Sequence, residues 1–185
     1  YASERIVEIQ EELKEKIRAI AGKDLGPYLN RLKVKKTAEK PAKTPVVKEI
    51  RRKGSAVLVI GASTGGPSAL QRVLSELPAD YPLPIIVVQH MPPVFTRQFA
   101  RRQDRNTALA GKEAEDGDKL TPGLILVVPG GHHLLITGKG SPKVKIIERQ
   151  EGYRFVPSVD RTMASAAETF GSRAIGVLLT GMGND

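Results

Sequence analysis

The sequence predicts a three-layer α/β fold, in which a mostly parallel β-sheet lies between helices on both faces. Short apolar runs such as 57–60 and 84–88 are typical of strands buried on both sides of a sheet. Segments with helical spacing separate these runs along the chain, and no internal repeat is visible. This alternation predicts a Rossmann-like arrangement in the 185-residue chain, with room for one sizeable domain and an appendage.

The expected elements follow one another from residue 56 onward. Strands are expected at 57–60, 84–88, 124–128 and 174–179, and helices at 68–77, 95–105 and 159–170, the last beginning near Ser158. Runs at 134–136 and 144–146 predict a β-hairpin around residues 138–142.

Residues 1–54 differ in character from this pattern. Residues 1–22 carry an amphipathic stripe that predicts a helix, interpreted as the end of a preceding domain. Residues 23–54 read as a linker. Between Arg31 and Lys53 there are ten Lys and Arg residues and two Glu residues, which gives a net charge of +8. A basic segment with Pro41 and Pro45 and no interleaved aromatic residues indicates a solvated linker rather than a nucleic-acid surface. Residues 55–185 then form the main domain.

The composition excludes several classes of site. The chain contains no cysteine, which excludes disulfides, a thiolate nucleophile and zinc–thiolate ligands. No apolar run reaches the roughly 18 residues that a membrane span needs. The N-terminus carries charge from Glu4 onward and lacks the apolar core of a signal peptide, so a cytoplasmic location is expected.

The segment VLVIGASTGGP, residues 57–67, is the most informative stretch. It reads as a strand, a tight turn and the start of a helix, where free backbone N–H groups favour negative charge. Such a turn can bind a pyrophosphate, or it can present Ser63 as a nucleophile beside N–H groups that bind an oxyanion. It can also let a helix pack closely on a sheet. The stretch alone leaves all three interpretations open.

Chemically useful residues follow four of the predicted strands. Ser63 follows the first, His90 the second, His132 and His133 the third, and Asp185 ends the segment after the last. Because the carboxyl ends of parallel strands gather at one edge, a nucleophile, a base and an orienting carboxylate are expected to meet there. The histidine that supplies the base stays open between these positions, although the prolines after His90 favour that residue.

The dinucleotide interpretation fits the sequence less well. Gly61, Gly65 and Gly66 resemble the glycine pattern of short-chain dehydrogenases, but Pro67 stands where the last glycine is needed. No acidic residue ends the second strand, and no Tyr is followed four residues later by Lys. An anion- or nucleotide-binding module without hydrolytic turnover remains the alternative function.

Five blocks carry a resemblance to a known family. They are GASTGGP (61–67), QHMPPVFTRQFARR (89–102), KEAEDGD (112–118), PSVD (157–160) and LLTGMGND (178–185). In this order they resemble the catalytic domain of CheB-type chemotaxis methylesterases, from about residue 56 to the end. Residues 1–22 resemble the final helix of that family's receiver domain, and residues 23–54 resemble its interdomain linker.

The resemblance implies hydrolysis of γ-glutamyl methyl esters on chemoreceptor cytoplasmic helices, and deamidation of receptor glutamines. It implies Ser63 as nucleophile, His90 as base and Asp185 as its partner, with the backbone N–H groups of Thr64 and Met182 at the oxyanion site. It implies no metal and no cofactor, and its partners are the methylated receptor helices and the chain's own receiver domain. Because the family's domain continues beyond this motif, the chain is expected to be truncated at its C-terminus.

Overall fold

The structure is a computed structural model that describes residues 56–138 and 140–185. The predicted N-terminal helix at 1–22 and the linker at 23–54 lie outside the described residues. All described residues belong to the unit Arg51–Asp185.

A five-stranded sheet, with strand order β3-β4-β2-β1-β7, forms the centre of this unit, and every pair of neighbouring strands is parallel. Its strands are β1 (Val57–Ala62), β2 (Ile85–Gln89), β3 (Ala110–Glu113), β4 (Leu124–Val127) and β7 (Ala174–Leu178). In the register of β1, Ile60 lies opposite Val87 of β2 and opposite Val177 of β7. Both β1 and β2 are buried along their whole length, which explains their continuous apolar runs.

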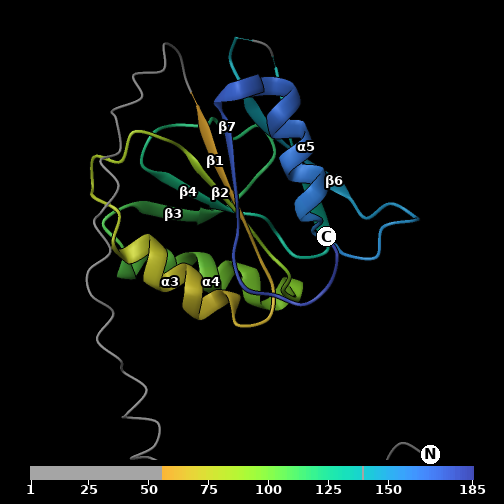
Figure 1. The fold of residues 1–185 in the computed structure, drawn as a ribbon, viewed down its shortest axis with the longest axis horizontal. Helices are drawn as coiled ribbons and strands as arrows, with labels where there is room; N and C mark the ends of the chain where they lie inside the picture. Colours follow the sequence, from red (N-terminus) through yellow and green to blue (C-terminus); the bar gives the residue numbers. More distant parts are fainter. Residues whose placement is uncertain (1–55, 139) are drawn as a thin grey trace, which may run out of the picture. The chain divides into compact units, whose positions relative to one another are not determined.

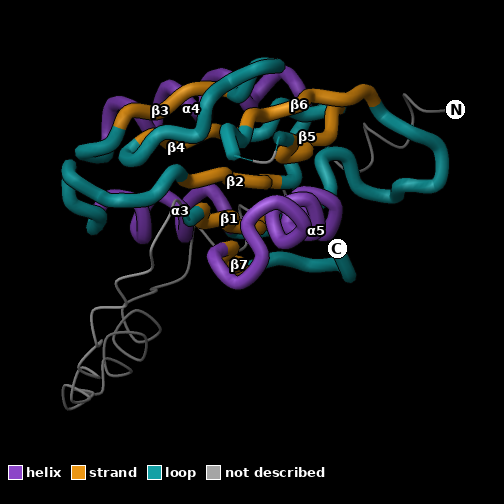
Figure 2. Tube along the Cα trace, turned by 90° about the horizontal axis from the view of Figure 1, so that it is seen from above, coloured by secondary structure: helices purple, strands orange, loops and turns teal. Residues whose placement is uncertain are grey.

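Helices cover both faces of the sheet, as predicted (Figure 1). Helices α3 (Gly66–Ser75) and α4 (Pro93–Asn106) pack on the face that carries Leu58 and Ile60. The opposite face carries Val57 and Val59. Helix α5 (Val159–Phe170) covers it together with an antiparallel hairpin of β5 (His132–Thr137) and β6 (Lys143–Glu148). The loop between β6 and α5 extends away from the strands (Figure 2).

Most predicted elements are confirmed, and α5 has the predicted bounds. Strand β3 was not predicted, because its sequence AGKE lacks an apolar run and an edge strand is only partly buried. Helix α3 begins two residues earlier than expected. Gly65 takes a left-handed conformation (φ 76°) before it, and Pro67 is tolerated in its first turn. Among the described helices, none is long and apolar enough to cross a membrane.

Candidate active site

The neighbouring strands β2, β1 and β7 deliver three polar side chains to one rim of the sheet. Ser63 follows β1, His90 follows β2, and Asp185 ends the segment that follows β7. All three line one open pocket of about 170 Å³. Drug-sized ligands and cofactors usually occupy pockets of about 300–1,000 Å³. The pocket therefore fits the end of a side chain better than a dinucleotide.

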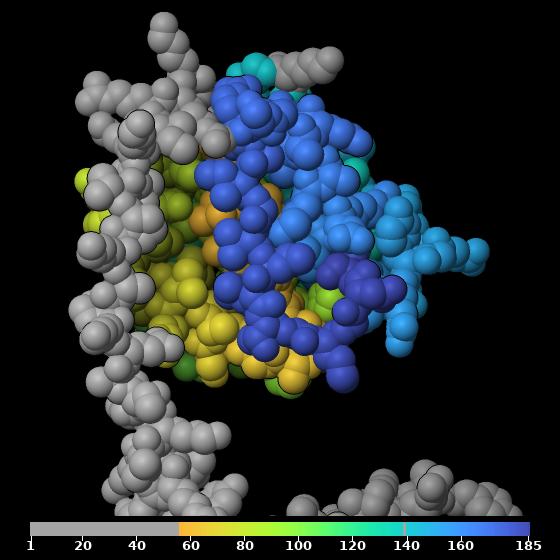
Figure 3. Space-filling view, viewed as in Figure 1, coloured from red at the N-terminus to blue at the C-terminus, as the bar shows by residue number. Residues whose placement is uncertain are grey.

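The turn after β1 is held from both sides. The Ser63 N–H donates to the Thr180 carbonyl at 3.0 Å, and the Ser63 carbonyl accepts from the Gly66 N–H at 2.8 Å and from Gln89 Nε2 at 2.9 Å. A Cβ added at Gly181 would lie only 2.8 Å from the Cβ of Ser63, so this close approach requires glycine. The segment after β7, dark blue in Figure 3, therefore lies directly against the serine turn.

His90 and Asp185 form a direct pair. Nε2 of His90 lies 2.8 Å from Oδ2 of Asp185. The same carboxylate accepts hydrogen bonds from Ser158 Oγ at 2.6 Å, from the Val159 N–H at 2.7 Å and from the Asp160 N–H at 3.4 Å. These donors form the first turn of α5, where the helix dipole favours a negative charge. The N-terminus of α5 is thus the support of the carboxylate.

The hydrogen bonds fix the protonation of this pair. Burial alone raises the pKa of Asp185, but the bonds from Ser158, Val159 and His90 outweigh it and hold that pKa below its ordinary value of 3.8. An ionised carboxylate only accepts hydrogen bonds, so Nε2 of His90 carries a proton. In the neutral ring the lone pair then belongs to Nδ1. This atom is buried and has no hydrogen-bond partner among the described residues.

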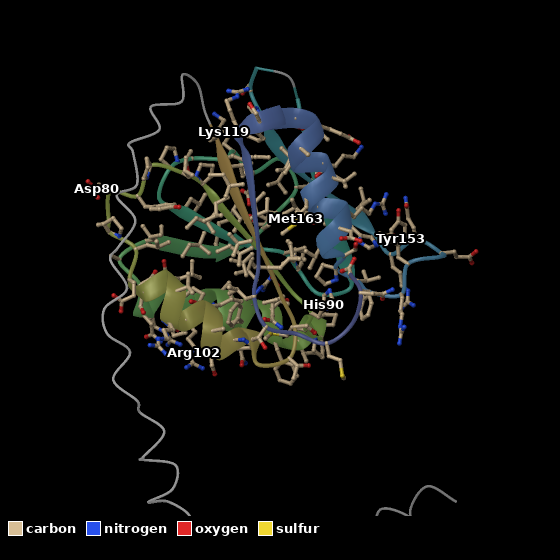
Figure 4. The ribbon with its side chains drawn as sticks, in the orientation of Figure 1. Asp80, His90, Arg102, Lys119, Tyr153 and Met163 are labelled. Atoms are coloured by element: carbon tan, nitrogen blue, oxygen red, sulfur yellow. The ribbon has the colours of Figure 1, made fainter. Side chains whose placement is uncertain are left out.

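Two further side chains hold His90 at the rim, near the start of α5 (Figure 4). The ring of Phe155 stacks on the imidazole, with centroids 4.8 Å apart and planes inclined by 3°. The amide Nε2 of Gln89 donates to the His90 carbonyl at 3.1 Å. The ring plane is thus set by Phe155 and the backbone by Gln89.

The other two histidines take different places. His132 and His133 begin strand β5, because the chain after β4 turns into the hairpin instead of staying at the rim. Nδ1 of His132 lies 3.3 Å from the Gly130 carbonyl, while His133 is fully buried against the edge of Tyr153. Neither lines the pocket that holds Ser63. The structure therefore brings His90 to the serine pocket and leaves the other two in the hairpin.

Of the two residues predicted at the oxyanion site, Thr64 follows Ser63 in the chain and Met182 lines the same pocket as Ser63. Met182 lines the pocket with an 80% exposed side chain, and Thr64 is exposed next to Ser63. Within the described part of the chain, the backbone N–H groups of Thr64 and Met182 donate no hydrogen bond. In the same part, no three His, Asp or Glu side chains are grouped as metal ligands.

The part of the chain that holds these residues is similar to known proteins. A sequence model of the CheB methylesterase family matches residues 58–185. This chain belongs to the CheB methylesterase family. A protein-glutamate methylesterase/protein-glutamine glutaminase of Pseudomonas syringae pv. syringae is 46% identical over 149 residues, which cover 80% of this chain and 38% of the relative. A similarly named Pseudomonas putida protein is 50% identical over 135 residues, which cover 73% of this chain and 36% of the relative.

A solved CheB structure has the same fold. The crystal structure of the Thermotoga maritima CheB methylesterase catalytic domain has a TM-score of 0.69 and 42% sequence identity to this chain, and the match covers 71% of this chain and 70% of that one. The present chain spans less than two fifths of the length of the two curated CheB relatives.

Sequence reasoning did not foresee three supporting residues of this CheB-family site. Gln89 lies in the block 89–102, and its signal was a polar residue directly before His90. Ser158 lies in the block 157–160, and its signal was a polar residue at the start of a predicted helix. Phe155 has no comparable signal, because it lies in the irregular loop before α5. Its place on His90 depends on how that loop folds back.

Proposed function

We propose that this CheB-family domain hydrolyses γ-glutamyl methyl esters on the cytoplasmic helices of chemoreceptors, with Ser63, His90 and Asp185 as a catalytic triad. The observation that carries the proposal is the pocket in which Ser63 lies with the half-buried, hydrogen-bonded pair of His90 and Asp185. The curated relatives are named as enzymes that act on protein glutamate and glutamine, and these names support glutamyl side chains of proteins as the substrate class.

In the first step, Ser63 Oγ attacks the ester carbonyl while its proton passes to His90. Nδ1 is the nitrogen left for this transfer, because Nε2 is engaged by Asp185. Asp185 holds the ring in this tautomer and stabilises the imidazolium that forms. As the tetrahedral intermediate collapses, the C–O bond to the methoxy group breaks, and His90 gives the proton to the leaving oxygen. Methanol departs and an acyl-Ser63 ester remains.

In the second step, water hydrolyses the acyl-enzyme. His90 accepts a proton from the water as its oxygen attacks the acyl carbon, and it then returns that proton to Ser63 Oγ. The product is a free glutamate carboxylate. Deamidation of a glutamine follows the same path, with ammonia leaving in place of methanol. Neither reaction consumes an external cofactor.

The oxyanion of each tetrahedral intermediate is stabilised by the backbone N–H groups of Thr64 and Met182. Their lack of partners within the described residues supports this role. A preorganised donor of this kind typically contributes about 3 kcal/mol to the transition state. We further propose that the enzyme acts in the cytoplasm, and that its partners include a receiver domain formed by the part of the protein before the linker.

The direct test is methanol release from methylated receptor by the full-length protein. Ser63→Ala removes the nucleophile, so release is expected to fall by a factor on the order of 10⁶, with only the residual catalysis from the oxyanion site and binding left. Ser68→Ala is the matched control, because this exposed serine of α3 lies just beyond the turn and is expected to leave release unchanged.

Each other outcome has a defined meaning. Equal release by the parent and Ser63→Ala would refute the nucleophile assignment. No release by either protein, combined with tight binding of the receptor, would favour the anion-binding module. In that case binding is expected to weaken strongly with added salt.

A further inference from the structure

A second hollow shares His90 with the serine pocket. We call it the arginine groove. It has a volume of about 460 Å³ and is lined by His90, Pro92, Pro93, Phe155, Arg149 and Arg154 among others. His90 lines both this groove and the pocket that contains Ser63. A polypeptide whose side chain enters the serine pocket therefore has neighbouring residues within reach of the groove.

The groove combines an apolar floor with two uncompensated positive charges. Pro92, Pro93 and Phe155 supply apolar surface, and the Arg154 guanidinium lies 5.4 Å from the centre of the Phe155 ring. Arg149 and Arg154 are exposed, and neither forms an ion pair with any residue that the structure describes. Their guanidinium donors are thus free to bind a ligand.

The acidic residues nearby do not cancel this charge inside the groove. Glu148 and Glu151 flank Arg149 along the chain, and both are exposed, but neither lines the groove. Two guanidinium groups above apolar surface match a carboxylate that is carried on a polypeptide, because arginine binds carboxylates through paired N–H donors.

We propose that the arginine groove binds carboxylate side chains of the substrate polypeptide close to the ester that enters the serine pocket. The proposal rests on the proposed function and names its substrate preference: an esterified glutamate with acidic neighbours. Esterification removes the charge of the reacting glutamate itself. A positive groove therefore recognises the neighbours, while the reacting side chain enters as a neutral group.

The test uses the full-length protein and two helical peptides. Each peptide carries one γ-methyl glutamate, and the third and fourth positions on both sides are all glutamate in one peptide and all alanine in the other. The wild type is expected to hydrolyse the glutamate-flanked peptide with about three- to tenfold higher kcat/KM, mainly through a lower KM. In the Arg149→Gln/Arg154→Gln double variant this ratio is expected to fall to about one.

Arg105→Gln provides the matched control. Arg105 is also an exposed arginine, but it lies in the last turn of α4, whereas the groove adjoins the first turn. The control is expected to keep the wild-type ratio. The groove proposal is overturned if the double variant keeps the wild-type ratio, or if Arg105→Gln lowers the ratio as much as the double variant does.

A binding measurement separates this proposal from the proposed function. Fluorescence anisotropy of the two labelled peptides with Ser63→Ala reports affinity without turnover. If the wild type hydrolyses neither peptide, the proposed function fails, while a three- to tenfold tighter binding of the glutamate-flanked peptide still supports the groove. If Ser63→Ala binds both peptides equally, the groove proposal fails even where hydrolysis is normal.

Discussion

At the scale of single residues, the amide of Gln89 connects the two halves of the candidate site. Its Nε2 donates both to the Ser63 carbonyl and to the His90 carbonyl. This fixes the orientation of the amide, because the flipped group would place oxygen against two carbonyl oxygens. Gln89 is buried, so no water competes for these bonds. One side chain therefore sets the distance between the serine turn and the histidine.

Gln89→Met tests this connection. Methionine has a similar length but no donor, so the His90 carbonyl loses its side-chain partner and the serine turn is held less tightly. We expect the free energy of unfolding to fall by about 1–3 kcal/mol. We also expect kcat to fall by about tenfold or more, because small misplacements of reacting groups are costly. Denaturant unfolding and steady-state kinetics measure the two effects.

Gln103→Met is the control for this substitution. Gln103 is equally buried on α4, yet neither atom of its amide group has a hydrogen-bond partner among the described residues. Losing that amide is expected to cost little stability and to leave kcat unchanged. If both variants lose kcat equally, Gln89 has no specific positioning role.

Sequence reasoning predicted candidate residues for the chemistry, but it did not predict the side chains that hold them in place. Ser63, His90 and Asp185 each follow a predicted parallel strand, and the carboxyl ends of such strands gather at one edge of the sheet. The choice among the three histidines depended on the resemblance to a family, since His132 also follows a strand. Phe155 could not be predicted, because loop residues have no periodicity that places them against a partner.

At the scale of secondary structure, the first turn of α5 has two functions. Ser158 accepts from the Arg161 N–H at 3.2 Å as the N-cap of the helix, and it donates to Asp185 at 2.6 Å. The Val159 N–H donates to the same carboxylate. The helix therefore gains its cap and the carboxylate gains its position from one structural feature.

Ser158→Ala is expected to weaken both functions. Loss of the cap and of the bond to the carboxylate should lower the free energy of unfolding by about 1–2 kcal/mol. Because the Ser158 hydroxyl helps to hold the pKa of Asp185 low, that pKa is expected to rise in the variant. Thermal unfolding and carboxyl carbon NMR titration of Asp185 provide the two readouts.

Ser158→Thr should restore the low pKa of Asp185, because threonine keeps the hydroxyl. Ser75→Ala provides the comparison at an exposed position, where the hydroxyl donates to the Arg72 carbonyl at 3.1 Å. It is expected to leave the pKa of Asp185 unchanged. An unaltered pKa of Asp185 in Ser158→Ala would contradict the role assigned to the hydroxyl.

The elements themselves were predictable where burial imposes a pattern. Strands β1, β2 and β4 are buried and apolar, and α5 begins at a serine N-cap. The edge strand β3 was missed because its partly exposed residues leave no apolar run in the sequence. The same limit applies to boundaries, since β1 extends two residues beyond its predicted end, to Ala62.

At the scale of the whole described unit, the order of the strands creates the site. His90 and Asp185 are 95 residues apart in the chain, and they meet because β2 and β7 lie on either side of β1. The apolar runs predict that parallel strands exist, but they do not state which strands are neighbours. The strand order depends on how the helices and the hairpin cover the two faces, which is a property of the folded chain.

The layer formed by α5 and the β5–β6 hairpin contains a buried histidine, and its protonation makes the stability of the fold depend on pH. His133, on strand β5 of the hairpin, is fully buried; its ring makes a T-shaped contact with Tyr153, and Arg161 lies over the Tyr153 ring. Burial, together with the positive charge of Arg161, lowers the pKa of His133 below its ordinary value of 6.5, and the charge of Asp185 offsets this in part. The folded protein therefore holds this histidine neutral more strongly than the unfolded chain does.

Stability is consequently expected to fall as the pH drops below about 6.5. In that range His133 binds a proton in the unfolded chain but stays neutral in the folded chain. The contribution of neutral His133 to the free energy of unfolding is therefore complete above the unfolded pKa and decreases as the pH falls toward the folded pKa. One such proton gives a slope of up to about 1.4 kcal/mol per pH unit. The measurement is the free energy of unfolding between pH 8 and pH 5, from urea titrations.

His133→Leu should flatten this slope, because it removes the titrating group while keeping an apolar side chain in the same space. The comparison is between slopes, so a constant change in stability from repacking does not affect it. If His133→Leu shows the wild-type slope, the acid sensitivity originates elsewhere. If it shows a flatter slope, the protonation of His133 accounts for the loss of stability in acid.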